Sequence, residues 1–250
     1  MRFIIMHKTN PRWEAGEVPS PQLIAKVGAL LGDLAQKGVL ESGEGLRASA
    51  QGVRLRFIEG TRTVTPGPFT GENELPAGFT ILRTGLMDEA VEFASRQAAA
   101  LGDVEIDVRP VTEAWDIGMA PKPDTVTTRR FMAVRKATAA TEAGAAPTLA
   151  QRAALAGIEE DGRRKGMVLA AEGIRPSRLG RRYKNTSDGV RALDGPFTES
   201  KELIAGYVIV KADSLDDAGR MAERYRDVVE AGEVDVRELE DTASPRISRT

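Results

Sequence analysis

The stretch that decides the fold is "LDGPFTESKELIAGY" at residues 193–207, which returns in altered form as "TPGPFTGENELPAGF" at residues 65–79. The two copies lie 128 residues apart, and the same offset aligns residues 2–113 with 130–241 without a gap, at roughly 30% identity. A match of that length indicates that one unit occurs twice. The period is too long for a solenoid repeat and suits a whole small domain.

This repeat predicts how the chain is divided. We predict a first domain over residues 1–118, a linker over 119–128, a second domain over 129–241 and a disordered tail over 242–250. Pro121 and Pro123, with their polar neighbours, favour an extended linker. The tail is predicted from its small and polar residues at the end of the chain.

Both copies show the same order of expected elements. In the first copy these are a strand at 2–8, a helix at 21–38, a strand at 39–46, a hairpin at 53–65, a strand at 78–83, a helix at 87–101 and a strand at 104–111. Ser20 suits the N-cap of the first helix, and Gly38 ends it. This helix carries apolar residues at helical spacing, namely Leu23, Val27, Leu30, Leu31 and Leu34, whereas its counterpart at 149–166 is more polar.

The order strand, helix, strand, hairpin, strand, helix, strand is the ferredoxin-like pattern. One such sheet leaves an open face and unpaired edges, and packing two sheets together is a common remedy. We therefore predict an α+β protein in which two fused ferredoxin-like units form a pseudo-dimeric α+β barrel. The chain would then be a monomer that acts as its own dimer, or would pair further into a homodimer.

Composition excludes several classes of protein. With 35 basic and 37 acidic residues the formal net charge is -2, which argues against nucleic acid as a partner. The absence of cysteine excludes disulfides and cysteine-ligated metals. No segment approaches the roughly 18 apolar residues of a membrane span, and the first residues lack the core of a signal peptide. We expect a cytoplasmic protein with no membrane partner.

The phrase "DGPFTESKELIAGY" follows "RFMAVRKATAATEAG" at 130–144 and "AAEGIRPS" at 170–177. Together these motifs resemble the YCII-related family, and in particular its DGPF-motif branch. The first copy resembles the same branch through "KTNPRWEAG", "GEGLRAS" and the closing "AWDIG" at 114–118. The resemblance covers nearly the whole chain in two copies, and it implies a dimeric α+β barrel related to ferredoxin-like folds.

The resemblance also implies some functional possibilities. Some members of the DGPF branch are encoded beside extracytoplasmic-function sigma factors, which implies a functional link to such a factor. Some YCII-like relatives are cofactor-free enzymes, among them a dehydrochlorinase of chlorinated hydroxyquinones, which use an early helical histidine together with an aspartate. The helices expected here at 21–38 and 149–166 contain no histidine. No cofactor is expected.

Most of the polar candidate residues lie in the second copy. Asp194 and Glu172 are the candidate catalytic carboxylates, and the candidate ligand-binding residues are Lys136, Glu142, Arg175, Lys201 and His7 of the first copy. Carboxylates near Arg and Lys could bind an anionic or enolisable ligand, or remove a proton with a tuned pKa. Alternatively, Asp194 only forms an Asx-type turn, and Glu172 forms a structural ion pair with Arg175.

The first copy lacks part of this set. Pro66 replaces Asp194 and Asn73 replaces Lys201, so at most one fully equipped pocket is expected. His7 is the lone histidine, and a lone histidine at the end of a strand is more often structural than catalytic. One histidine, no cysteine and no acidic cluster with EF-hand spacing predict no metal site.

Three functions stay open at this point. The first is a small-molecule binding or regulatory protein that uses a cleft in the second half. The second is a cofactor-free lyase or isomerase acting on an acidic or enolisable ring compound, with Asp194 or Glu172 as the base. The third is a protein-interaction module that uses the basic run between Arg163 and Lys184, although a hairpin with a solvated charged face is the favoured interpretation of that run.

Overall fold

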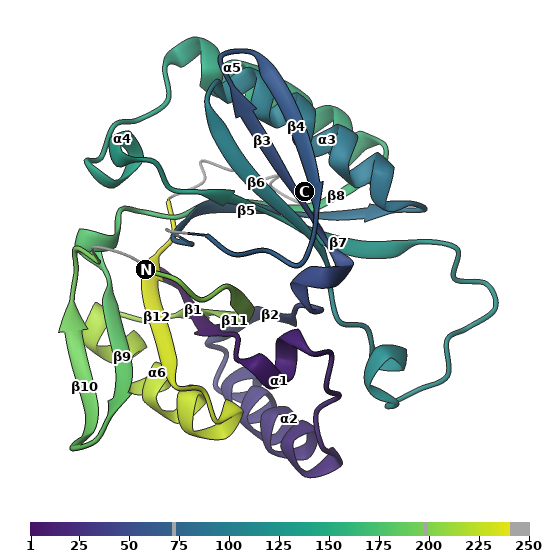
Figure 1. The fold of residues 1–250 in the computed structure, drawn as a ribbon. Coiled ribbons are helices and arrows are strands. Elements are labelled where there is room, and N and C mark those ends of the chain that lie inside the picture. Colours follow the sequence, from purple (N-terminus) through teal and green to yellow (C-terminus); the bar gives the residue numbers. More distant parts are fainter. Residues whose placement is uncertain (72–73, 198–199, 241–250) are drawn as a thin grey trace, which may run out of the picture.

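A computed structural model describes residues 1–71, 74–197 and 200–240, and the predicted tail lies outside them. The described chain forms two six-stranded antiparallel sheets with helices on their outer faces (Figure 1). The elements of the first half are β1 (Arg2–Lys8), α1 (Pro11–Glu14), α2 (Pro21–Gln36), β2 (Leu40–Gly45), η1 (Ser49–Gln51), β3 (Val53–Ile58), β4 (Thr61–Pro66), β5 (Pro76–Thr84), α3 (Met87–Leu101), β6 (Val104–Pro110) and η2 (Ala114–Ile117).

The second half repeats this order. Its elements are β7 (Arg129–Lys136), α4 (Ala139–Glu142), α5 (Leu149–Arg164), β8 (Val168–Gly173), η3 (Ser177–Leu179), β9 (Arg181–Thr186), β10 (Gly189–Asp194), β11 (Ile204–Lys211), α6 (Leu215–Val229) and β12 (Glu233–Glu238). Each of these elements begins and ends 128 residues after its counterpart in the first half, to within one or two positions. The strands and helices expected from the sequence are therefore present in both halves.

Each sheet combines strands from both halves. The first sheet has the order β10-β9-β12-β1-β11-β2, and the second has the order β4-β3-β6-β7-β5-β8. In the first sheet, β1 and β2 of the first half pair with strands of the second half, and β1 lies between β11 and β12. The four strands β12-β1-β11-β2 have the ferredoxin-like order, but that unit takes its first two strands from one half and its last two from the other.

The predicted closed barrel is not formed by the described strands. Strands β10 and β2 are the edges of the first sheet, and β4 and β8 are the edges of the second. Closing a barrel requires the edge strands to pair with one another. Here each sheet instead buries one face against helices and the other against the second sheet, so the α+β class holds and the barrel does not.

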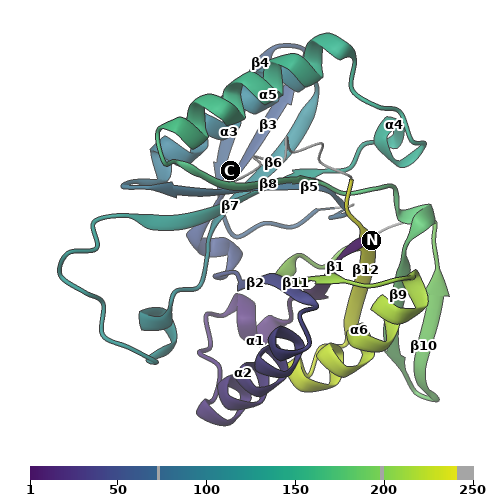
Figure 2. The same cartoon turned by 180° about the vertical axis from the view of Figure 1, so that it is seen from behind.

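The protein has four layers, helix, sheet, sheet and helix. Helices α2 and α6 cover the first sheet, and α3 and α5 cover the second (Figures 1 and 2). Between the sheets lies an apolar core that includes Ile4, Met6, Phe79, Met132 and Ile209. Alternate residues of β1 face opposite sides, so Phe3 and Ile5 pack under the helices while Ile4 and Met6 pack between the sheets.

Ion pairs also join the two sheets. Arg2 of β1 contacts Glu172 of β8 at 2.7 Å, and Arg130 of β7 contacts Glu44 of β2. These pairs occupy equivalent positions in the repeat, since each joins the first strand of one half to the second strand of the other. No helix in the described ranges is long and apolar enough to cross a membrane.

Helix α2 begins where the sequence predicts, but only part of its apolar stripe is buried. The side chain of Ser20 accepts a hydrogen bond from the backbone N–H of Leu23, and Pro21 occupies the first helical position. Of the predicted apolar stripe only Leu30 and Leu34 are buried. The other three residues, Leu23, Val27 and Leu31, are half-buried because they line a cavity.

Candidate binding pocket

A cavity of about 380 Å³ lies between α2 and the first sheet. We call it the α2 pocket. Its walls are mostly apolar and come from both halves of the chain, including Leu23, Ile24, Val27 and Leu31 of α2, Leu46 and Ala48 after β2, Ala205, Tyr207 and Val208 of β11, and Tyr225 and Val229 of α6. This volume is within the range of small-molecule sites, which bury an apolar ligand and orient it with a few polar groups.

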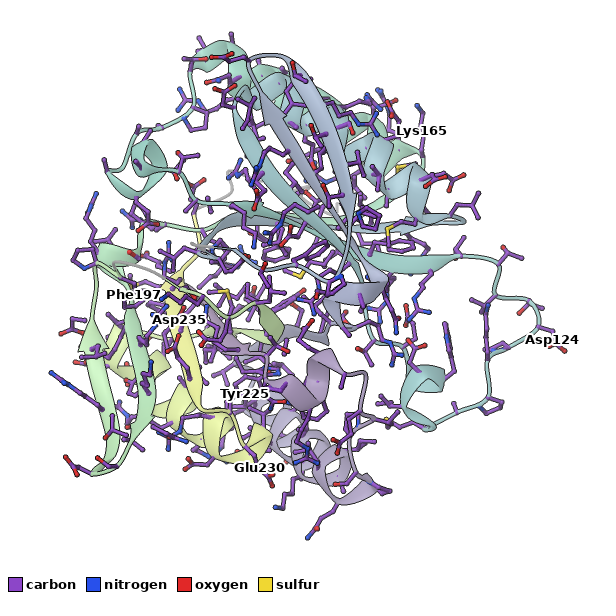
Figure 3. All side chains as sticks on the ribbon, viewed as in Figure 1. Asp124, Lys165, Phe197, Tyr225, Glu230 and Asp235 are labelled. Carbon is purple, nitrogen blue, oxygen red and sulfur yellow. The ribbon has the colours of Figure 1, made fainter. Side chains whose placement is uncertain are left out.

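One polar pair lies in the wall of this pocket. His7 Nδ1 is 2.8 Å from the hydroxyl oxygen of Tyr225, and the two rings meet edge to face with centroids 5.5 Å apart. Figure 3 labels Tyr225 on α6, the helix that faces β1. Burial lowers the pKa of His7 to about 4, and burial also raises the pKa of Tyr225 above its usual range. Both side chains are therefore neutral at pH 7.

Two surface segments border the pocket. Trp13 comes from the short helix α1, where the side chain of Asn10 caps the helix by accepting from the backbone N–H of Trp13. Ile117 and Met119 come from the end of η2 and the residues after it. Nothing in the periodicity of the sequence placed Trp13 or residues 117–119 beside α2.

The charged residues of the pocket are Glu17, Glu44 and Arg47. Burial raises the pKa of Glu44, and Arg130 acts in the opposite direction. Arg47 Nε donates to the side-chain oxygen of Gln51 at 3.2 Å. With two carboxylates and one guanidinium, the pocket does not favour a strongly anionic ligand.

The equivalent region of the second half has a different chemistry. At the positions of His7, Leu23 and Leu31 it carries Arg135, Gln151 and Glu159. Arg135 Nη2 donates to the backbone oxygen of Ala77 at 2.9 Å, and burial lowers the pKa of Arg135. Burial likewise raises the pKa of Glu159. The apolar lining is thus a property of the first-half helix, as the difference in polarity between the helix sequences indicated.

The other candidate residues lie outside the α2 pocket and are not brought together. Asp194 ends β10 in the first sheet, whereas Glu172 lies on β8 in the second sheet. Glu172 pairs with Arg2, and Arg175 pairs with Glu238 at 2.9 Å, so the two do not pair with each other. Lys201 is exposed before β11.

Glu142 and Lys136 have structural partners. Glu142 accepts hydrogen bonds from the backbone N–H and the hydroxyl of Ser177, and it lies 3.3 Å from Arg237. Lys136 is buried against Glu74 and Asp107. His7 is the candidate residue that lines the pocket, and Glu44 and Arg47, the first-half counterparts of Glu172 and Arg175, line it as well.

The repeated phrase "GPF" has a structural role in the turn that follows β10. A Cβ added to Gly195 would lie 1.8 Å from the backbone oxygen of Ser177, so only glycine fits there. The backbone N–H of Phe197 donates to the Ser177 hydroxyl at 3.0 Å. Gly67, Ser49 and Phe69 repeat both contacts in the first half. The turn is therefore held by its backbone and by a buried serine.

Asp194 contributes little to this turn. Its side chain is 71% exposed and pairs with Arg181 at 2.6 Å on the surface. We expect Asp194→Ala to change the free energy of unfolding by less than about 1 kcal/mol, because exposed ion pairs contribute little. Urea denaturation of both proteins measures this difference. A loss of several kcal/mol would show that the aspartate holds the turn.

Two buried charge clusters were not predicted from the sequence. In one, Asp235 lies 3.0 Å from Lys8 and 2.6 Å from Arg182, whose guanidinium stacks 4.4 Å from the ring centroid of Phe197. Figure 3 shows Phe197 and Asp235 close together. The other cluster has the equivalent residues Lys136, Arg54, Asp107 and Phe69, with Glu74 added. The signal that could have revealed them is the retention of these residues at the same offset in both copies.

The basic run of the sequence does not form one free patch. Arg182 is buried in its cluster, Arg181 contacts Asp194 and Asp216, and Lys165 contacts Asp161. Within the part of the chain that the structure describes, no group of three or more acidic or histidine side chains could hold a metal ion.

The described part of the chain is thus an α+β structure of two composite sheets that contains a mainly apolar pocket of small-molecule size. Residues 130–242 match the family model of the YCII-related domain, so the second half contains such a domain. That match names a domain and no activity. No curated protein and no solved structure matches the chain.

Proposed function

We propose that this protein binds a small, mainly apolar molecule in the α2 pocket. The observation that carries the proposal is the half-buried apolar face of α2 above a cavity whose wall holds a neutral His7–Tyr225 pair. A ligand that removed this face from water would gain about 25 cal/mol for each Å² of apolar surface buried. The polar pair would supply orientation.

The asymmetry between the halves supports a single site. The helix that corresponds to α2 carries Gln151 and Glu159 where α2 carries Leu23 and Leu31. The face of α2 that borders the pocket is apolar and half-exposed. A purely structural helix does not require such a face, because exposed apolar patches usually serve binding. The proposed site uses both halves, since α6 and β11 of the second half form one of its walls.

We also propose that the chain is a tandem duplication of a DGPF-type unit and that its two halves form a pseudo-dimer. The coincidence of element bounds at one offset supports the duplication. Each sheet contains strands of both halves. This arrangement supports an origin from two separate chains that paired their strands in a dimer. The proposal gives Asp194 and Glu172 no acid–base role, because each is engaged in an ion pair outside the pocket.

Two glycines of α2 provide the test. Gly28 lines the pocket, and a Cβ there meets nothing within 4 Å, so Gly28→Phe places a ring in the cavity without displacing backbone. Gly32→Phe is the matched control, because Gly32 has equal space on the same helix and does not line the pocket. Both changes replace a helical glycine, which removes a helix-propensity cost of similar size.

The probe is N-phenyl-1-naphthylamine, a neutral apolar dye whose fluorescence rises when it leaves water. We expect saturable binding at one site in the wild type, at least tenfold weaker binding in Gly28→Phe, and affinity within twofold of wild type in Gly32→Phe. Equal binding by all three proteins would place the dye elsewhere. A lack of saturable binding in the wild type would contradict the proposal.

A further inference from the structure

The hydrogen bond between His7 and Tyr225 determines which imidazole nitrogen carries the proton. A neutral imidazole has one N–H donor and one acceptor nitrogen. If Nδ1–H donated to the tyrosine oxygen, the phenolic proton would remain buried, since no other partner of this hydroxyl is found among the described residues. If the hydroxyl donates to Nδ1, the phenolic proton is paired, and the donor left without a partner is the ring N–H at Nε2, on the side chain that lines the pocket. An unmade bond to a buried donor is costly, so the second arrangement is favoured.

This arrangement leaves an N–H group at Nε2. The described residues provide no hydrogen-bond partner for Nε2. Nε2 is also not one of the fully buried atoms without a partner, so it is accessible rather than enclosed by protein. Because His7 lines the α2 pocket, Nε2 is open to the cavity. The pocket therefore presents a neutral donor on an otherwise apolar wall. Its natural complement is an acceptor without charge, because Glu17 and Glu44 would oppose an anion.

We propose that the ligand of the α2 pocket is an uncharged, mainly apolar molecule with a carbonyl oxygen that accepts a hydrogen bond from Nε2–H of His7. This inference rests on the proposed function, because it concerns the same cavity. It specifies three further properties of the ligand, namely its polarity, its lack of charge and the atom that anchors it.

Two isosteric probes test the inference. The ketone 2-acetylnaphthalene and the hydrocarbon 2-isopropenylnaphthalene differ only in a carbonyl oxygen that becomes a CH₂ group. Each is titrated against protein loaded with N-phenyl-1-naphthylamine, and dye displacement gives its affinity. We expect the wild type to bind the ketone about five- to tenfold more tightly, as one net hydrogen bond provides. His7→Phe should bind both compounds with a ratio near one.

Tyr225→Phe is the second variant, in case His7→Phe does not fold. It removes the hydroxyl that fixes the imidazole tautomer, so the preference for the ketone should fall while the hydrocarbon still binds. Equal affinity for both probes in the wild type would overturn the carbonyl inference and leave the pocket intact. A preference that survives in His7→Phe would overturn it as well. Failure of both probes and of the dye to bind would instead contradict the proposed function.

Discussion

Replacing Asp235 with asparagine is expected to lower the free energy of unfolding by about 3 kcal/mol or more, because breaking a buried ion pair leaves an uncompensated charge. Asp235 is fully buried and contacts Lys8 and Arg182. Within the described residues it is the carboxylate that Lys8 contacts, and the Lys8 ammonium also donates to the Ser200 hydroxyl at 2.8 Å. Denaturation by urea measures the loss.

The loss should depend on pH. Burial alone would raise the pKa of Asp235, but the charges of Lys8 and Arg182 outweigh it and hold the pKa below the usual range. A carboxyl group with a lowered pKa in the folded state stabilises the fold above its unfolded pKa and loses that effect as pH falls through the folded value. The difference between wild type and Asp235→Asn should therefore be full near pH 7 and shrink below about pH 4.

Asp107→Asn is the matched control for this prediction. Asp107 is the counterpart of Asp235, but Glu74 also contacts both Arg54 and Lys136 in that cluster. Burial raises the pKa of Asp107, and the nearby Glu105 adds to this effect. Since Glu74 remains beside both cations when Asp107 is neutralised, the substitution should cost only on the order of 1 kcal/mol. Equal losses in the two variants would contradict this account of the clusters.

Gly195→Ala is expected to destabilise the protein by about 3 kcal/mol or more, because overpacking against backbone cannot be relieved by a side-chain rotation. The new Cβ would meet the oxygen of Ser177 at 1.8 Å and its carbonyl carbon at 2.5 Å. The same residue, Ser177, holds Phe197 and Glu142, so its displacement would disturb the whole turn. Thermal and urea denaturation both report the change.

Gly157→Ala is the control for the glycine prediction. Gly157 lies inside α5 and has nothing within 4 Å of its Cβ position, so alanine should leave stability unchanged or raise it by up to about 1 kcal/mol. If Gly195→Ala were as well tolerated as Gly157→Ala, the close approach to Ser177 would not be the reason for a glycine in the repeated phrase.

Local structure could be predicted from this sequence because its signals are local. The Ser20 cap, the helical spacing of apolar residues and the order of the expected elements indicated strands and helices that the structure contains. The exchange of strands between sheets could not be predicted in the same way. The corresponding strands of the two halves have similar sequences, so β1 could pair with strands of either half. In the structure β1 pairs with β11 and β12 of the other half.

The candidate site was predictable only in part. His7 was singled out because it is the lone histidine, and it lines the pocket. The opposite wall comes from Tyr225, which is 218 residues away from His7, and no spacing rule connects the two. The "DGPF" phrase drew attention to Asp194, whereas the structure gives its glycine and phenylalanine the buried contacts. A recurring motif indicates constraint, and here the constraint is close packing of a turn.

The most direct test of the central claim is NMR of the His7 side chain, whose signals are unambiguous because the sequence contains one histidine. The ring nitrogens of ¹⁵N-labelled protein are followed with pH and during titration with N-phenyl-1-naphthylamine. We predict a neutral ring with a pKa near 4 and ¹⁵N shifts that change until one equivalent of dye is bound. A ring that titrates near 6.5, as free histidine does, and that does not respond to bound dye would contradict a binding pocket lined by His7.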